Sequence, residues 1–134
     1  MSAVFADTSL LVAFVSEKDE LHPAAADFML SFEGHIVTTD WVLVELGNYL
    51  GKTSDRTAFV PFVKQMQADD RFRIVPASDD LFTEGAELYD QRPDKQWSLT
   101  DCVSFVVMNR EGIQQAMTAD HHFEQAGFHA LLRS

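Results

Sequence analysis

The chain has 134 residues, of which 46% are hydrophobic, and a formal net charge of −11. Its length is typical of one domain and its apolar content is enough for a core, so we expect a single domain over residues 1–134 and exclude a disordered chain. No apolar run approaches the ~20 residues of a membrane helix, and the first residues lack the basic start of a signal peptide. The single cysteine, Cys102, excludes an internal disulfide, and together these features predict a cytoplasmic protein with no membrane partner.

The acidic net charge indicates which kinds of partner the protein binds. Nucleic-acid-binding proteins usually present a basic surface, whereas this chain has 21 Asp and Glu residues against 10 Lys and Arg residues. The surplus indicates a cluster of acids that holds metal cations, or an acidic surface that meets a basic protein. Solubility alone explains part of the surplus, whatever the function.

The spacing of apolar residues predicts strands that alternate with helices. In chain order we expect a strand over residues 4–6, helices over 10–15 and 22–30, a strand over 35–38, helices over 41–50 and 54–69, a strand over 72–76, helices over 78–90 and 98–110, and strands over 115–119 and 128–132. Asp40 is the expected N-cap of the third helix, and Gly51 and Gly112 suit helix ends. This order implies a parallel sheet with helices on both faces, and such sheets bind ligands at the carboxyl ends of their strands.

Three acidic residues stand where a strand ends or a helix begins. Asp7 and Asp120 directly follow expected strands, and Asp101 lies in the first turn of an apolar helix. Each also has a simpler explanation, because Asp7 and Asp120 suit N-cap positions and Ser98 with Asp101 fits the acidic variant of a capping box. Taken singly, the cap and the functional interpretation explain each residue about equally well.

Glu45 lies on a helix whose apolar residues form a stripe. Val42, Leu46 and Tyr49 share one side, and Glu45 follows Val42 by three residues on that same side. A carboxylate that faces a core is costly unless it is paired or bound to a metal. The alternative is a glutamate at the edge of the stripe that reaches solvent.

The four acids, Asp7, Glu45, Asp101 and Asp120, come from four separate elements that a parallel sheet can bring to one edge. Clustered carboxylates repel one another and do not all stay ionised unless cations neutralise them. Mg²⁺ and Mn²⁺ prefer oxygen ligands. One such ion, or a pair about 3.5–4 Å apart, can activate water and stabilise the leaving oxygen in phosphodiester cleavage.

Several segments of the chain resemble the PIN-domain nucleases, and within them the VapC-type toxins of bacterial toxin–antitoxin pairs. The segments are Phe-Ala-Asp-Thr-Ser over residues 5–9, Val-Glu-Leu over 44–46, Trp-Ser-Leu-Thr-Asp-Cys-Val-Ser-Phe over 97–105, Thr-Ala-Asp-His-His-Phe over 118–123 and Gly-Phe over 127–128. The resemblance spans essentially the whole chain. Each segment alone is weak, and their order and spacing together are specific.

The resemblance implies a three-layer α/β/α sandwich around a mostly parallel sheet of four to five strands. It implies a Mg²⁺- or Mn²⁺-dependent endoribonuclease in which Asp7, Glu45, Asp101 and Asp120 bind the metal and carry the catalysis. Ser9 and Thr100 match positions where a hydroxyl lies near that site. His122 matches a position that is often histidine in this subgroup, with an RNA-contacting or structural role.

The resemblance also implies partners. Such toxins are typically homodimers that cut RNA and are held inactive by a cognate antitoxin, which commonly inserts an arginine or similar group into the acidic pocket. An acidic toxin surface suits a basic partner. The residues that hold the RNA backbone are harder to predict, because the basic residues are few and scattered; candidates are Lys52, Arg56, Lys95 and Arg110.

Two other classes of function stay open. A receiver-like phospho-switch module shares the alternating β/α order, but it needs paired early acids and a late lysine, and no lysine follows Lys95. A catalytically silent binding module could share the whole fold. The presence of all four acids argues against the silent module. Metal binding that depends on those carboxylates would distinguish the metal-dependent enzyme from a silent module.

Overall fold

The computed structural model describes residues 3–133 and contains one five-stranded sheet. All its strands run parallel in the order β3-β2-β1-β4-β5, with β1 (Ala3–Ala6), β2 (His35–Thr39), β3 (Phe72–Val75), β4 (Gln115–Met117) and β5 (His129–Ala130). The helices are α1 (Thr8–Val15), α2 (His22–Ser31), α3 (Asp40–Leu50), the short 3₁₀ helix η1 (Arg56–Ala58), α4 (Phe59–Ala68), α5 (Asp79–Gln91), α6 (Leu99–Glu111) and α7 (His121–Gln125). The predicted parallel sheet is confirmed, with five strands.

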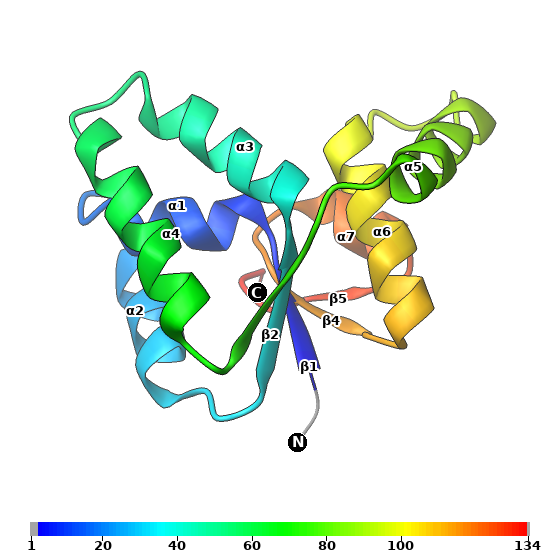
Figure 1. Ribbon diagram of the computed structural model, residues 1–134. Helices are drawn as coiled ribbons and strands as arrows, with labels where there is room; N and C mark the ends of the chain where they lie inside the picture. The colour runs from blue at the N-terminus through cyan, green and yellow to red at the C-terminus, as the bar shows by residue number, and fades with distance from the viewer. Residues whose placement is uncertain (1–2, 134) are drawn as a thin grey trace.

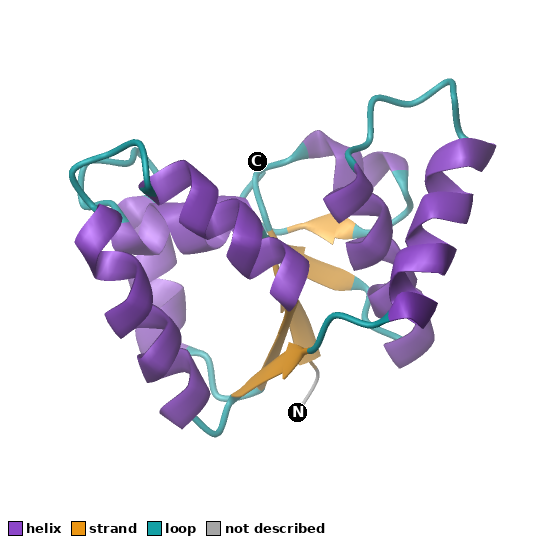
Figure 2. Cartoon of the chain, turned by 45° about the horizontal axis from the view of Figure 1, so that its top comes forward, coloured by secondary structure: helices purple, strands orange, loops and turns teal. Residues whose placement is uncertain are grey.

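The helices cover both faces of the sheet, which makes the predicted three-layer sandwich. Helices α1 to α4 lie on one side of the strands and α5 to α7 on the other (Figures 1 and 2). The chain builds outward from β1 through β2 to β3, then returns through α5 and α6 to place β4 on the other side of β1. The strand order therefore reverses between β1 and β4, which is where doubly wound sheets bind their ligands.

Strand β1 is the centre of the sheet. Phe5 pairs with Val37 of β2 on one side and with Ala116 of β4 on the other. Val4, Phe5 and Ala6 are all buried, as expected for a parallel strand covered on both faces. The residue that follows this strand is therefore delivered to the middle of the carboxyl edge.

Aromatic side chains attach α6 and α7 to the sheet. The Phe105 and Phe123 rings meet edge to face at 5.0 Å, and Phe123 also lies against Phe5. Trp97 packs edge to face on Phe105 at 5.0 Å, and its indole N–H donates to Gln125. These contacts fix the beginning of α6 and the whole of the short α7 relative to the end of β1.

Two local predictions are corrected. The N-cap of α3 is Thr39, whose hydroxyl accepts from the Val42 N–H; Asp40 instead accepts from the Ala77 N–H and ties the β3–α5 connection to α3. The helix expected over residues 54–69 begins as η1 and becomes α-helical only at Phe59. Pro61 explains the late start, because proline is tolerated only in the first turn of an α-helix.

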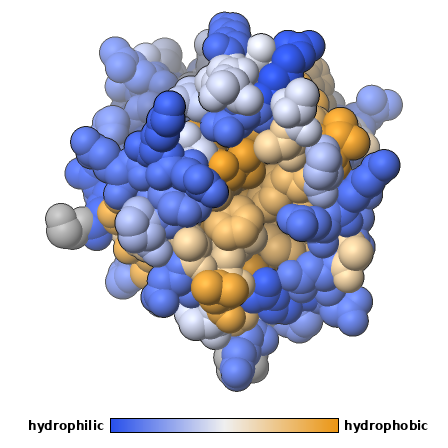
Figure 3. Space-filling view, turned by 90° about the vertical axis from the view of Figure 1, so that its left-hand side faces the viewer, coloured by the Kyte–Doolittle hydropathy of each residue, from blue (hydrophilic) through white to orange (hydrophobic). Residues whose placement is uncertain are grey.

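The outer face formed by α2 and α4 carries an apolar hollow. Figure 3 shows this face with an apolar centre surrounded by hydrophilic side chains. A hollow of about 270 Å³ lies here, and Leu30 at its rim is 87% exposed. Its apolar lining consists of Phe14, Met29, Leu30, Phe62, Met66 and Phe72. No helix within residues 3–133 is long and apolar enough to cross a membrane.

Helices α5 and α6 pack at close range over Gly85. A Cβ added at Gly85 would lie 2.5 Å from Val103 Cγ2 and 3.3 Å from the Val103 backbone. Valine in a helix has one strongly preferred rotamer, so it cannot turn away cheaply. We therefore expect Gly85→Ala to lower the free energy of unfolding by about 1–3 kcal/mol, although alanine is favoured over glycine in a helix by roughly 0.5–1 kcal/mol.

Urea unfolding measures this effect. Glu87→Ala on the exposed side of α5 is the control and should change the free energy by less than about 0.5 kcal/mol. In the Gly85→Ala/Val103→Ala double variant the loss should be smaller than the sum of the single losses, because the clashing methyl is gone. A stabilised Gly85→Ala variant would contradict the close packing.

Candidate active site

A cleft of about 460 Å³ opens at the carboxyl edge of the sheet, beside the point where the strand order reverses. Its walls bring together all four predicted acids, Asp7, Glu45, Asp101 and Asp120, and add a fifth, Asp19. The other lining residues are Thr8, Ser9, Val12, Leu21, Tyr49, Gln96, Ser98 and His122. The sequence therefore predicted the main acidic groups of the cleft, and it missed Asp19.

Asp7 occupies the N-cap position of α1 without acting as a cap. Its side chain makes no capping hydrogen bond and is instead only 4% exposed, where Oδ2 accepts from the Thr118 hydroxyl at 2.9 Å. Burial raises the pKa of Asp7 from its ordinary 3.8 to about 7, and the nearby Asp101 and Glu45 charges add to this rise. The simple capping interpretation therefore does not account for Asp7.

Glu45 projects from the edge of α3 toward the start of α1. The Thr8 hydroxyl donates to Glu45 Oε1. The buried side of α3 consists of Val42, Leu43, Leu46 and Leu50, whereas Tyr49 is 53% exposed. The predicted stripe through Tyr49 was wrong, and Glu45 is a partly buried residue at the edge of the core with a hydroxyl partner.

Asp101 is both a helix cap and a cleft residue. Ser98 and Asp101 form a complete capping box, in which Asp101 Oδ2 accepts from the Ser98 N–H at 3.1 Å and the Ser98 hydroxyl accepts from the Asp101 N–H at 3.0 Å. The same carboxylate lies 3.0 Å from His122 Nδ1. Burial raises the pKa of Asp101, while the Ser98 N–H and His122 oppose the rise.

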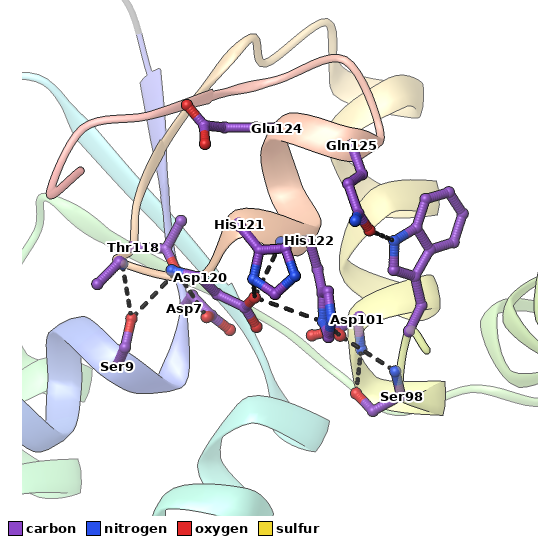
Figure 4. Close-up of polar contacts among 12 residues, drawn as sticks. Asp7, Ser9, Ser98, Asp101, Thr118, Asp120, His121, His122, Glu124 and Gln125 are labelled. Atoms are coloured by element: carbon purple, nitrogen blue, oxygen red, sulfur yellow. Dashed lines mark hydrogen bonds and ion pairs between the residues drawn. The ribbon is translucent and has the colours of Figure 1, made fainter. Parts of the chain in front are cut away.

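Asp120 likewise combines the two roles. Its Oδ1 accepts from the His122 N–H at 2.9 Å and so caps α7, and it lies 3.4 Å from His122 Nδ1. The imidazole therefore stands between the Asp101 and Asp120 carboxylates (Figure 4). For both acids the capping and the cleft interpretations hold together.

A hydroxyl network joins the beginning of α1 to the end of β4. Thr118 donates to Asp7 and accepts the Asp120 N–H at 3.0 Å. Because a hydroxyl has one proton, Ser9 is then the donor in its 3.1 Å hydrogen bond to Thr118. Ser9 also accepts the Ala119 N–H. This network holds the Asp7 and Asp120 backbones at a fixed separation (Figure 4).

Of the three predicted supporting residues, two line the cleft and one does not. Ser9 and His122 line the cleft, as expected. Thr100 does not belong to its lining, and its carbonyl accepts from the Ser104 hydroxyl within α6. Thr8 and Thr118 are the supporting residues that sequence reasoning missed, although both lie in the segments that carry the family resemblance, next to or two residues from an acid.

The donor set fits a hard divalent cation. Four carboxylates from separate elements face one cleft, and two of them have a pKa raised mainly by burial. Such a site binds protons or cations more readily than it stays fully ionised. Oxygen donors favour Mg²⁺ and Mn²⁺. Asp120 and His122, which line the cleft, and the exposed His121 beside them also place three ligand atoms within 4.8 Å of one another.

Comparison with known proteins assigns the family. The model of the PIN domain matches residues 4–129, nearly the whole chain. This chain belongs to the PIN-domain family. The predicted family, fold and nuclease class are therefore confirmed, and PIN-domain nucleases in general depend on divalent metal ions.

The relatives include an rRNA endonuclease. The 23S rRNA-specific endonuclease VapC20 of Mycobacterium tuberculosis is 28% identical over 125 residues, which cover 93% of this chain and 95% of the relative. Its crystal structure, described as that of a Sarcin-Ricin loop cleaving toxin, matches with a TM-score of 0.84 at 27% identity over 93% and 95% of the two chains. FitAcB from Neisseria gonorrhoeae shares the fold, with a TM-score of 0.66 at 13% identity over 95% and 94%.

The buried Asp7 makes the stability of the metal-free PIN domain depend on pH. Between pH 3.8 and about 7 the folded protein keeps a proton on Asp7 that the unfolded chain has released. The free energy of unfolding contributed by this group therefore falls as the pH rises through that window, by up to about 1.4 kcal/mol per pH unit. Asp7→Asn removes the titration, so its stability relative to the wild type should rise from pH 4 to pH 8.

Urea unfolding in the presence of a chelator tests this expectation. The exposed Asp70→Asn variant serves as the control, because it lies outside the cleft and should follow the wild type at each pH. A difference between Asp7→Asn and wild type that is the same at pH 5 and pH 8 would contradict the burial of an ionisable Asp7.

Proposed function

We propose that this PIN-domain protein is a Mg²⁺- or Mn²⁺-dependent endoribonuclease that acts as the toxin of a toxin–antitoxin pair. The observation that carries the proposal is the meeting of Asp7, Glu45, Asp101 and Asp120, from four separate elements, in one cleft. The similarity to VapC20, an rRNA endonuclease and toxin by its description, supports RNA as the substrate.

The four carboxylates would hold the metal, and the groups behind them would fix their orientation. When bound, a divalent ion supplies Lewis acidity toward the phosphodiester and activates a water molecule for attack. Thr118 orients Asp7 and Thr8 orients Glu45 through their hydroxyls. The Ser98 N–H and His122 orient Asp101, and the His122 N–H orients Asp120. Such outer partners keep ligand oxygens directed into a site at little entropic cost.

The acidic charge and the exposed apolar side chains of the surface support the binding of other proteins. The acidic charge of −11 suits a basic antitoxin that inserts a cation among the carboxylates. Several exposed large apolar side chains outside the cleft support further contacts, with the antitoxin or a second copy of the chain; they are Leu30, Val44, Phe82, Tyr89 and Leu131. The antitoxin and the homodimer are predictions, as is the cytoplasmic location.

Removal of one of the proposed metal-binding carboxylates should strongly slow cleavage. We expect Asp7→Asn, Asp101→Asn and Asp120→Asn each to reduce the rate of Mg²⁺-dependent cleavage of purified bacterial 23S rRNA by at least about 100-fold, since even outer partners of a metal site cost 10–100-fold. Primer extension along the rRNA measures the rate and locates the cut. Asp70→Asn is the control and should cleave at the wild-type rate.

A catalytically silent binding module would give different results in the cleavage and metal-binding measurements. A silent module would cleave no RNA with Mg²⁺ or Mn²⁺ and would show no metal binding by calorimetry that depends on Asp7. Retention of full cleavage by Asp7→Asn would defeat the proposed role of the carboxylates. The receiver-like alternative has lost its basis, because the chain belongs to the PIN-domain family and its strand order differs from the 2-1-3-4-5 order of receivers.

Loss of an orienting hydroxyl should have a smaller effect. Thr118→Val keeps the shape of the side chain and removes the hydrogen bond to Asp7, as well as the acceptor of the Asp120 N–H. We expect cleavage to fall about 10–100-fold and the Mg²⁺ concentration for half-maximal rate to rise. Thr118→Ser, which keeps the hydroxyl, is the matched control and should stay near the wild type. Equal rates for Thr118→Val and Thr118→Ser would contradict the orienting role.

A further inference from the structure

The structure separates the basic residues into those that are neutralised and those that are available. Six of the ten lie within ion-pair distance of a carboxylate: Arg71, Arg73, Arg92, Lys95, Arg110 and Arg133. Arg110, an expected RNA contact, bonds both Asp80 and Glu84. Among the described residues the other four cations, Lys18, Lys52, Arg56 and Lys64, have no carboxylate at that distance.

Two of these four cations share one hollow. It has a volume of about 490 Å³ and lies at the end of α3, where the chain turns into η1 and α4. Its lining contains Lys52 and Arg56 and no carboxylate. The remaining lining residues are Gly47, Asn48, Gly51, Phe59 and Val60. In a chain of net charge −11 this is a local concentration of positive charge with an amide and an aromatic ring beside it.

Arg56 is held in place in this hollow. Its Nη1 donates to the Gly51 carbonyl at 2.9 Å, and a Cβ at Gly51 would lie only 3.0 Å from that nitrogen. A Cβ at Gly47 would likewise lie 3.1 Å from the Phe59 ring. The two glycines therefore let the guanidinium and the ring lie against the α3 backbone. A guanidinium has five N–H donors, so the bond to Gly51 leaves others free.

One face of α3 connects the hollow to the acidic cleft. Glu45 and Tyr49 line the cleft, while Asn48 lines the hollow. Glu45 and Tyr49 lie at i and i+4 on one side of α3, and Lys52 follows in the turn after the helix, where its N–H donates to the Tyr49 carbonyl. Along the axis of α3, Glu45 lies about 7.5 Å from the last helical residue, Leu50, and Lys52 follows two residues later. The half-exposed Tyr49 ring lies between the acid and the cations.

We infer that this face of α3 binds the RNA strand on the Glu45 side of the cut, with Tyr49 as a stacking surface for a base and Lys52 and Arg56 as phosphate ligands. The inference rests on the proposed ribonuclease function and names the residues that hold its substrate. Aromatic stacking with a basic track is how proteins bind single-stranded nucleic acid. Phosphate contacts position the strand and carry no sequence information, so this surface contributes affinity rather than choice of target.

The alternative role of Arg56 is to cap the carbonyl end of α3. A structural cap would change the stability of the fold and leave the salt dependence of RNA binding alone. A phosphate ligand changes that dependence, because each phosphate contact releases counterions and contributes about −0.7 to the slope of log K against log salt for a single strand. The slope therefore discriminates between the two roles.

The test measures binding of a fluorescent oligo-uridylate by anisotropy at several salt concentrations and fixed Mg²⁺. The Asp7→Asn background prevents cleavage during the measurement. We expect Lys52→Ala and Arg56→Ala each to make the slope about 0.7 shallower and the double variant to make it about 1.4 shallower. Lys64→Ala, which removes an exposed cation of α4 outside the hollow, is the matched control and should keep the slope. Lys52→Arg should also keep it.

Tyr49 variants test the stacking surface. Tyr49→Ala should weaken binding of the oligo-uridylate about 5- to 150-fold, while Tyr49→Phe, which keeps the ring, should bind within about twofold of the parent. Circular dichroism melting shows that each variant is folded. An unchanged slope in a folded Lys52→Ala/Arg56→Ala variant, or equal binding by Tyr49→Ala and Tyr49→Phe, would overturn the inference.

The inference and the proposed function fail in different measurements. Absence of cleavage of 23S rRNA by the wild-type protein with Mg²⁺ and Mn²⁺ would defeat the proposed function. The binding slope is measured without cleavage and bears on the α3 surface alone. If the double variant keeps its RNA binding and salt slope but loses a protein partner, the surface is a protein-docking site and the inference is wrong.

Discussion

The burial of Asp7 is the constraint on which the rest of the site depends. Strand β1 is paired on both sides and covered on both faces, so the residue at its carboxyl end has little access to water. A carboxylate there is expensive to ionise, and the pKa of about 7 expresses that cost. A cation in the cleft would offset the cost of ionising Asp7. The buried carboxylate that destabilises the metal-free protein would then stabilise the metal-bound protein. Metal binding at the proposed site would therefore stabilise the fold.

The remaining acids are held by groups that already belong to the fold. Asp101 closes a capping box and Asp120 caps α7, so the hydrogen bonds that begin these helices also fix two carboxylates of the cleft. His122 contacts both, through its ring and its backbone N–H. Thr118 similarly serves two acids with one hydroxyl. Helix capping and metal binding both require a carboxylate oxygen that is held in place at the start of a helix. The same residue can therefore serve both roles.

Most of the architecture could be predicted from the sequence because apolar periodicity locates strands, and Asp7 and Asp120 directly follow two of the expected strands. Asp101 was predicted from its place at the start of an apolar helix, and Glu45 from a stripe on α3 that was only partly right. The errors have physical causes. Thr39 and Asp40 are both good caps, and only the Ala77 contact decides between them. Tyr49 fits the α3 stripe by spacing, yet its side chain is 53% exposed. Thr8, Thr118 and Asp19 join the cleft through contacts between distant segments, which local patterns do not encode.

A net charge of −11 is compatible with an RNA substrate, because the affinity for RNA depends on where the unpaired basic side chains lie on the surface. Most basic side chains are neutralised by the chain's own acids, so the average field repels a polyanion. Lys52 and Arg56 escape this pairing and line one hollow at the end of α3, the helix that carries Glu45 and Tyr49 into the cleft. With cations bound among the carboxylates, a strand held at that end would meet a neutralised cleft. Without them it would meet five acids, so metal binding would also govern whether the substrate can enter.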